Sequence, residues 1–275
     1  GGSFEGHYQT LLAQGHSYAL ETARRWSDRA DQSLTVHVLN ALLTAWNLLD
    51  YLSPSLQLSE TEKYLLCLGI TLHDYNKYSQ GQGEEAPKAH EVSDILALCE
   101  SLGEKLDFNA FWSDWKHYIS EIGFLAQNTQ FKAGTNVMSS NWSKFTIRDP
   151  RRLTLPLRHL LGFGDVAVHL QDPQDLVTDT GGDRLREHLN VLGIRQKLVY
   201  HYLKNSVGIL TNGIHNSVVL FSQELDWKPL LFFARGVIYL APKDSETPDR
   251  EELKAFLWEN IKGILSSKML NGKIG

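Results

Sequence analysis

The chain has 275 residues, of which 42% are hydrophobic and 21% are charged, and its formal net charge at pH 7 is −5. This composition excludes bulk disorder and is sufficient for one large domain or one and a half. The negative charge excludes recruitment of nucleic acid by an overall basic field, so a polyanionic substrate would require a bound cation or a partner chain. Cys67 and Cys99 are the only cysteines, and their apolar helical surroundings predict reduced thiols in a cytoplasmic protein.

No signal peptide or membrane-spanning segment is expected. The longest apolar stretch, residues 229–241, is too short to cross a bilayer and contains Arg235. The closing residues, 269–275, do not have the composition of a finished terminus. We therefore expect the sequence to be a fragment of a longer protein.

Apolar residues at helical spacing predict helices over most of the chain. The first two are expected at 7–30 and 35–51. Ser59 and Glu62 form a capping-box pattern, which predicts that a third helix begins there and leads to His73. A long polar connection is expected at 130–150. Further helices are expected at 87–102, 109–129, 153–170, 183–204, 207–225 and 248–266.

Only the residues after Pro229 have the composition of β-strands. Residues 230–233 and 237–240 flank a short segment that ends in Gly236, a pattern typical of a β-hairpin. The predicted fold class is therefore mainly α, a helical bundle with a small β-hairpin near the C-terminus. We expect a first domain at 1–205, and at 206–275 the start of, or the junction to, a further domain.

The helix that begins at Ser59 is predicted to end in a group of ionisable side chains. His73 and Asp74 follow an apolar run, and Lys77 comes next on the same helical face. Imidazole nitrogen and carboxylate oxygen are ligands for Zn, Mn, Fe, Ni and, more weakly, Mg. This stretch alone is explained equally well by a metal site and by a helix that ends in ordinary polar residues.

Further His and Asp residues extend this pattern along the chain. His37, the doublet His73-Asp74, His90 and Asp165 each lie in or beside a predicted apolar helix. The arrangement resembles the HD superfamily of metal-dependent phosphohydrolases, whose pattern is a lone His, a His-Asp doublet and a late Asp.

Three local segments carry the resemblance further. Residues 72–77 resemble the family's Leu-His-Asp-x-Gly-Lys with Asn76 in place of Gly, and Gly164 replaces Ala in the closing Ala-Asp segment. Residues 90–93 resemble the His-Glu-x-x-Ser of the HD nucleases in type I CRISPR systems, with the Ser one position early. Residues 229–240 are similar to a segment of the type I-D CRISPR large subunit, which carries an HD nuclease at its N-terminus.

The resemblance covers about residues 30–245 and implies an HD-domain helical bundle that hydrolyses phosphodiester bonds. It implies one or two divalent cations, which would be Mn, Mg, Ni, Co or Fe. His90 would belong to a second cation, and Lys77 would orient Asp74 or contact phosphate; His73, Asp74 and Lys77 would be the catalytic residues. The implied ligands of the first cation are His37, His73, Asp74 and Asp165.

The type I-D likeness implies that the substrate is single-stranded DNA. It implies that the protein cleaves this DNA as an endonuclease or exonuclease in antiviral defence. It implies other interference subunits and guide RNA as partners of the full-length protein, and no membrane. Two alternatives stay open. One is an HD phosphohydrolase of small nucleotides with the same metal site. The other is a non-catalytic helical module that binds partner subunits.

One departure from the family leaves the number of cations open. HD nucleases of this group present a His-His pair after the His90 position, whereas the corresponding residues here include Gln127 and Asn128, whose amides are poor ligands. His117 is a less certain candidate for a substitute ligand, because its neighbours Trp115 and Tyr118 indicate packing there.

The remaining histidines and arginines have less specific patterns. His169 shares the helical face of Asp165, and a structural role is the favoured interpretation. Arg148, Arg151 and Arg152 belong to the densest basic cluster, which either follows a nucleic-acid backbone or forms a solvated, salt-bridged face. No ligand spacing is found for His7, His16, His159, His188, His201 or His215.

Overall fold

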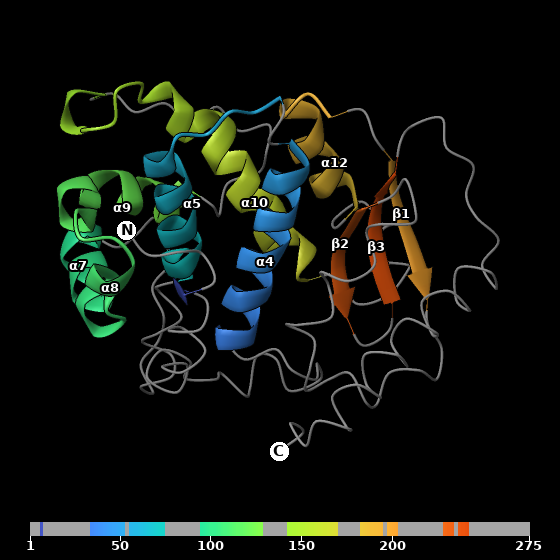
Figure 1. Ribbon diagram of the computed structural model, residues 1–275, viewed down its shortest axis with the longest axis horizontal. Helices are drawn as coiled ribbons and strands as arrows, with labels where there is room; N and C mark the ends of the chain where they lie inside the picture. The colour runs from blue at the N-terminus through green and yellow to red at the C-terminus, as the bar shows by residue number, and fades with distance from the viewer. Residues whose placement is uncertain are drawn as a thin grey trace, which may run out of the picture.

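The computed structural model describes residues 6–7, 34–52, 55–74, 94–128, 142–169, 182–194, 197–202, 228–233 and 236–241. Helices make up most of these ranges, which confirms the mainly α fold class. In Figure 1, α4 (Leu34–Leu52) lies between α5 (Glu60–Leu72) and a small β-sheet. The helix α10 (Arg158–Ala167) packs against both α4 and α5, so these three helices form the centre of the molecule.

A second group of helices lies beyond α5 (Figure 1). It comprises α7 (Ile95–Lys105), α8 (Phe108–Phe111), the 3₁₀ helix η2 (Trp115–Tyr118) and α9 (Ile119–Asn128), of which α9 packs on α5. Before α10 come the short helical turns η3 (Trp142–Lys144) and η4 (Leu153–Leu157), and α12 (Gly182–Val191) packs on α10. Within the part of the chain that is described, no helix has the length and apolar character needed to cross a membrane.

The predicted start of α5 is confirmed by its capping box. The Ser59 hydroxyl accepts a hydrogen bond from the Glu62 amide at 3.3 Å, and the Glu62 carboxylate accepts one from the Ser59 amide at 2.7 Å. Eight consecutive residues, Leu65–Leu72, are buried after this start. The helix is thus held at one end by its cap and along its length by the core, and it delivers His73 to the interior.

The helix predicted at 109–129 is interrupted, so this prediction was wrong in part. Trp112 leaves the helical conformation, with φ −149° and ψ 106°. Its ring stacks on Tyr64 of α5 at 5.2 Å between ring centroids and on Tyr118 at 4.7 Å. Burial of this aromatic stack against α5 outweighs the helical periodicity of the local sequence.

The helix predicted at 183–204 ends much earlier, and this prediction was wrong beyond α12. Gly193 has φ 77°, the left-handed conformation typical of a residue just past a helix, and the Ile194 amide donates to the Leu189 carbonyl at 2.9 Å. The chain then forms the strand β1 (Lys197–Tyr202). Gly193 is therefore the residue in the sequence that marks the end of this helix, which helical periodicity alone did not predict.

The hairpin predicted near the C-terminus is confirmed. β2 (Lys228–Phe233) and β3 (Gly236–Ala241) are antiparallel, with Phe233 opposite Gly236. The strand order is β1-β3-β2, and β2 contacts α4. The sheet therefore joins strands from both sides of the predicted domain boundary at 205/206, and the domain division stays a prediction.

Other expected elements are confirmed in part or lie outside the described residues. The helix expected at 153–170 is regular as α10, whereas Leu155 in the preceding turn is extended, with φ −154° and ψ 113°. Asp94 caps α7 through a bond from the Ala97 amide at 3.1 Å. Four predictions concern residues outside the described part of the chain. These are the helix start at Pro87 and the helices expected at 207–225, at 248–266 and, apart from His7, at 7–30.

Both cysteines are free and buried, as the sequence predicts. Burial raises the pKa of the Cys67 thiol and of the Cys99 thiol, since a thiolate would lose its hydration in the core. Both side chains therefore behave as small apolar residues at neutral pH.

Candidate metal centre

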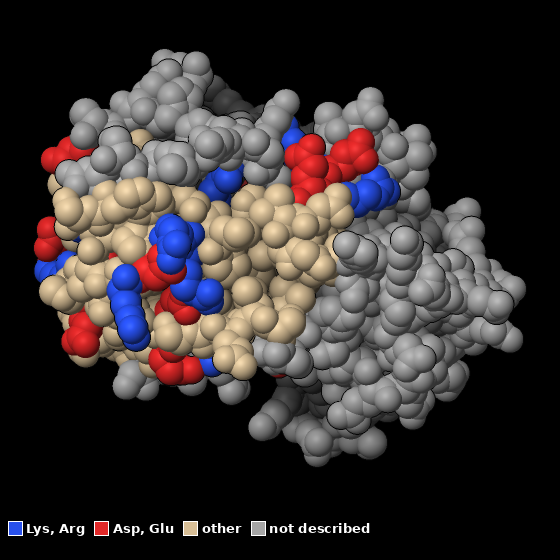
Figure 2. All heavy atoms as spheres, turned by 90° about the horizontal axis from the view of Figure 1, so that it is seen from above, with Lys and Arg blue, Asp and Glu red and all other residues tan. Residues whose placement is uncertain are grey.

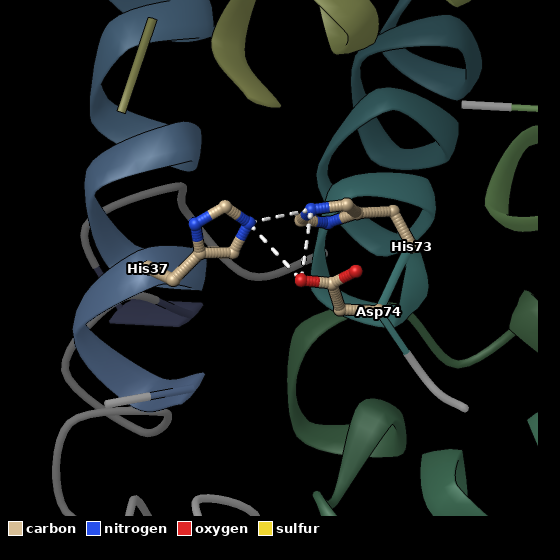
Figure 3. A group of neighbouring side chains, drawn as sticks. All are labelled: His37, His73 and Asp74. Atoms are coloured by element: carbon tan, nitrogen blue, oxygen red, sulfur yellow. Dashed lines mark hydrogen bonds and ion pairs between the residues drawn. The ribbon is translucent and has the colours of Figure 1, made fainter. Parts of the chain in front are cut away.

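Three helices bring their polar ends together at the centre of the bundle. His37 lies in the first turn of α4, His73 caps the C-terminus of α5 with Asp74 next to it, and Asp165 lies in the last turn of α10. Figure 3 shows His37 pointing from α4 toward His73 and Asp74. The exposed fractions of His37, His73 and Asp74 are 4%, 0% and 1%, so these polar groups lie inside the core.

The ligand atoms of these residues converge within a few ångströms. His37 Nε2 lies 3.0 Å from His73 Nε2, 3.1 Å from Asp74 Oδ2 and 3.3 Å from Asp165 Oδ1. His73 Nε2 lies 3.3 Å from Asp165 Oδ1 and 3.7 Å from Asp74 Oδ2. Two imidazole nitrogens and two carboxylate oxygens therefore lie close together, and the atoms of His37, His73 and Asp74 form a buried group that could hold a metal ion.

These separations fit the edges of a metal coordination polyhedron. At a metal–ligand distance of about 2.1 Å, ligand atoms are about 3.0 Å apart for an angle of about 90° and about 3.6 Å apart for an angle of about 120°. The observed separations, 3.0–3.7 Å, span this range. A mixed nitrogen and oxygen set suits Zn, Mn, Fe, Co and Ni. Both the geometry and the chemistry of the donors therefore fit a divalent cation.

A backbone contact fixes the tautomer of His73. Its Nδ1 donates a hydrogen bond to the Ile70 carbonyl at 2.5 Å, one turn earlier in α5. With the proton held on Nδ1, the lone pair of Nε2 points at the other ligand atoms. Histidines that bind metals are commonly oriented in this way by a carbonyl or carboxylate behind the ring.

The charges of the centre are strongly coupled when no cation is present. Burial lowers the pKa of His37, but hydrogen bonds to Asp165 and Asp74 and their charges raise it further, to about 9. Burial raises the pKa of Asp165, but the charge of His73 and contacts with His169 and His37 hold it well below the ordinary value. The metal-free centre therefore attracts a proton into the position where a cation would lie.

The approach of α10 to α4 depends on Gly164, the residue before Asp165. A Cβ atom at Gly164 would lie 2.7 Å from the Ala41 carbonyl oxygen and 3.2 Å from the Ala45 Cβ. The first neighbour is backbone of α4, which cannot move aside as a side-chain tip can. Gly164 therefore permits the close helix contact that brings Asp165 to His37.

The structure tests only one of the remaining sequence-predicted metal and catalytic residues. Lys77 and His90 lie outside the described residues, so their proposed roles stay predictions. His117 is exposed on η2, and the described clusters of ligand atoms do not include it.

Two arginines of the basic cluster take part in ion pairs. Arg151 pairs with Asp149 at 2.8 Å, and Arg152 pairs with Glu62 and donates to the Gln57 carbonyl. Arg148 is exposed. Figure 2 shows acidic and basic side chains interspersed over the described part of one face, which is the pattern of a solvated, salt-bridged surface. A role of these arginines in nucleic-acid binding stays a prediction.

The structure adds His169 to the centre, where the sequence favoured a structural role. His169 Nε2 lies 3.5 Å from Asp165 Oδ1, and the centroid of its ring is 4.9 Å from that of His37. His37, Asp165 and His169 together form a second group that could hold a cation. The spacing of four residues from Asp165 was the available signal, but a helical spacing alone does not separate ligands from packing residues.

Three other histidines are buried apart from these ligand groups, in line with the absence of a ligand spacing. His7 Nε2 lies 3.0 Å from the Thr71 hydroxyl, and the His7 ring stacks on Phe111. His159 Nδ1 and His188 Nδ1 are 3.1 Å apart between α10 and α12. Burial lowers the pKa of His7 to about 3; burial, followed by the charge of a neighbouring arginine or histidine, lowers the pKa of His159 to about 4 and of His188 to about 3.

Comparisons with known proteins add no family to this description. No protein-family model matches the chain. A search of curated proteins finds no match either.

Proposed function

We propose that this protein is a metal-dependent phosphodiesterase of the HD type that cleaves single-stranded DNA in a type I-D CRISPR interference complex. The observation that carries the proposal is the close approach of the His73, Asp74 and Asp165 side chains to His37 Nε2. These are the four positions that the resemblance to HD enzymes selects from the sequence. The buried free thiols fit a location in the reducing cytoplasm.

The residues of the centre have distinct roles in this proposal. His37 and His73 supply neutral nitrogen ligands, and Asp74 and Asp165 supply the negative charge that balances a divalent cation. Such a cation polarises a phosphoryl group and acidifies water, which is the chemistry that phosphodiester hydrolysis requires. Lys77, three residues beyond Asp74, would contact the phosphate.

The burial of the ligands indicates the side from which a phosphate approaches. The side chains of His73 and Asp74 are 0% and 1% exposed, whereas that of Asp165 is 16% exposed and that of His169 is 34% exposed. The centre is thus closed toward α5 and more open toward the end of α10. A substrate would enter on the α10 side, beside Asp165.

DNA is the favoured substrate because two segments beyond the four implied ligands of the first cation fit the CRISPR branch of the superfamily. These are the His-Glu pair at 90–91 and the hairpin segment at 229–240. The net charge of −5 means that affinity for DNA must come from the cation and from partner subunits.

The deciding experiment is a time course of single-stranded DNA cleavage with Mn, Mg, Ni, Co or no added metal. It compares the wild-type protein with His73→Ala/Asp74→Ala and, as a matched control, with His117→Ala on the exposed surface of η2. Metal-dependent cleavage that persists in the control and falls at least 100-fold in the double variant is expected, since two ligands are lost.

The other outcomes separate the alternatives. Cleavage that persists in the double variant would reject this centre as the source of activity. Bound metal with release of phosphate from nucleotides, but no DNA cleavage, would identify a phosphohydrolase of small nucleotides. Neither metal nor cleavage would identify a non-catalytic module.

A further inference from the structure

Helix α4 carries a row of polar side chains along one face. His37 of the metal centre begins the row, and Asn40, Thr44 and Asn47 follow it at spacings of three, four and three residues. Such spacings place residues on one face of a helix, with about 5–6 Å between the Cβ atoms of neighbours. From His37 to Asn47 the helix rises about 15 Å, at about 1.5 Å per residue. The row therefore leads away from the metal centre along most of α4.

The polar atoms of this row are buried and unpaired. Within the part of the chain that the structure describes, Asn40 Oδ1, Thr44 Oγ1 and Asn47 Nδ2 are buried without a hydrogen-bond partner. Thr44 is 0% exposed, and the two asparagines are partly buried. Thr71 of α5 differs, because its hydroxyl donates to the Cys67 carbonyl at 2.8 Å, one turn earlier in its own helix. Thr44 lacks this ordinary solution for a buried threonine.

Unpaired polar atoms in the interior are unfavourable for the folded state. Buried polar groups in native proteins nearly always have a partner in the protein or in ordered water, because an orphaned group loses its hydration without compensation. Three orphaned groups on one helix would remove a large share of the small net stability of a domain. Their regular spacing along one face therefore indicates a bound molecule that completes their hydrogen bonds.

The chemistry and spacing of the row indicate that this molecule is water. Amides and hydroxyls are uncharged, and each both donates and accepts hydrogen bonds, so an ion of either sign would match only some of these groups. A water molecule about 2.8 Å from each of two groups spans about 5–6 Å, which is the distance between neighbours on a helix face. The complete burial of Thr44 favours a small molecule, and buried waters typically satisfy such groups with about three hydrogen bonds each.

We propose that Asn40, Thr44 and Asn47 bind a row of ordered water molecules that leads along α4 to the metal centre. The inference uses the position of His37 but requires neither a bound cation nor DNA as the substrate. The row supplies water to the buried centre from the side of α4. The more open side, beside Asp165, thus stays available for a phosphate.

The test detects the bound waters by NMR in the metal-free wild-type protein, labelled at asparagine and threonine. We expect cross-relaxation peaks between long-lived water and the side-chain amides of Asn40 and Asn47, and also the methyl group of Thr44. The methyl group of Thr71 is the internal control. It should show no such peak, because the Thr71 hydroxyl is bonded to the Cys67 carbonyl and lies 3.0 Å from His7 Nε2. The absence of long-lived water at all three residues of the row would overturn the proposal.

Substitution Thr44→Val gives a second readout, because valine has nearly the same shape but no hydroxyl. With water bound, valine interrupts the row, so the water peaks at Asn40 and Asn47 should weaken and the urea midpoint of unfolding should fall. In a dry row, valine would remove an unpaired polar group and the midpoint would rise, which would reject the bound water. DNA cleavage is a separate measurement: bound water without cleavage would keep the row and reject the nuclease. Cleavage without bound water would do the reverse.

Discussion

At the scale of single residues, the centre is organised around His37 Nε2. This atom lies within 3.3 Å of one imidazole nitrogen and two carboxylate oxygens. In water such groups would be hydrated separately, whereas in the core each is stabilised mainly by the others. A cation or a proton is therefore needed at this point to balance the two carboxylates.

This balance makes metal affinity depend on pH. Because the pKa of His37 is raised to about 9 in the metal-free centre, a metal ion that binds below pH 9 must displace the proton from His37. The affinity for Mn²⁺ should rise about tenfold per pH unit between pH 7 and 9 and then level off. Titrations with Mn²⁺ across this range measure the slope, and NMR of the metal-free protein measures the titration of the His37 ring. A ring that titrates below pH 7 would contradict the prediction.

At the scale of secondary-structure elements, two contacts position the ligand-bearing helices. Gly164 allows α10 to approach the backbone of α4 at Ala41. The capping box of Ser59 and Glu62 begins α5, and the Glu62–Arg152 ion pair ties that end of α5 to the turn before α10. The first contact acts directly on the distance between ligands, and the second acts on the stability of a helix whose other end carries His73.

Substitution Gly164→Ala tests the helix contact. The added Cβ would lie 2.7 Å from the Ala41 carbonyl, so α10 must shift away from α4 and carry Asp165 with it. We expect a loss of about 1–3 kcal/mol in unfolding free energy and at least tenfold weaker metal binding. Urea unfolding and metal titration measure the two effects.

Gly123→Ala in α9 is the matched control for this change. There the added Cβ comes close only to the tip of the exposed Leu96 side chain, at 2.9 Å, because Ile95 lies no nearer than 3.9 Å. We expect stability to be unchanged or raised by up to about 1 kcal/mol, because alanine restricts the unfolded chain. Wild-type metal affinity in Gly164→Ala would show that the centre does not require the close contact.

A pair of substitutions separates the cap of α5 from its ion pair. Ser59→Ala removes the acceptor of the Glu62 amide and should cost about 1 kcal/mol of unfolding free energy. Glu62→Gln keeps a side chain that can complete the capping box but removes the charge that pairs with Arg152. Chemical denaturation of both variants measures the two contributions. A negligible effect of Ser59→Ala would show that packing alone determines the start of α5.

At the scale of the whole molecule, buried histidines make the fold sensitive to acid. Burial is the main cause that lowers the pKa of His7, His159 and His188 to about 3, 4 and 3, respectively. The unfolded chain binds protons at these groups near pH 6.5, whereas the folded protein does not. The contribution of these neutral histidines to the unfolding free energy is therefore complete above pH 6.5, and it is lost as the pH decreases toward the lowered pKa values.

The predicted slope of the unfolding free energy steepens as the pH falls from 6.5 to 5 and approaches roughly 4 kcal/mol per pH unit, because each of the three groups contributes up to about 1.4 kcal/mol per unit. Urea unfolding of the metal-free protein at several pH values measures it. In His7→Leu the slope should decrease by about a third, whereas the exposed His117→Gln should leave it unchanged. A stability that does not change over this range would contradict neutral burial of these histidines.

Features that depend on neighbouring residues in the chain could be predicted from the sequence. The Ser59–Glu62 cap, the hairpin around Gly236 and the burial of Cys67 and Cys99 follow from local pattern and hydrophobicity. The choice of the four ligand residues depended on their types and order along the chain.

Features that depend on distant residues were decided by the tertiary structure. Trp112 leaves its helix to stack on Tyr64, and residues 197–202 form a strand because β3 provides its partner. The candidate metal centre also depends on tertiary structure. The sequence predicted ligand residues on three helices, but the distances between those residues depend on how closely α4 and α10 pack. His169 joins them only because that packing turns the end of α10 toward His37, and no spacing within one helix specifies the distance to another.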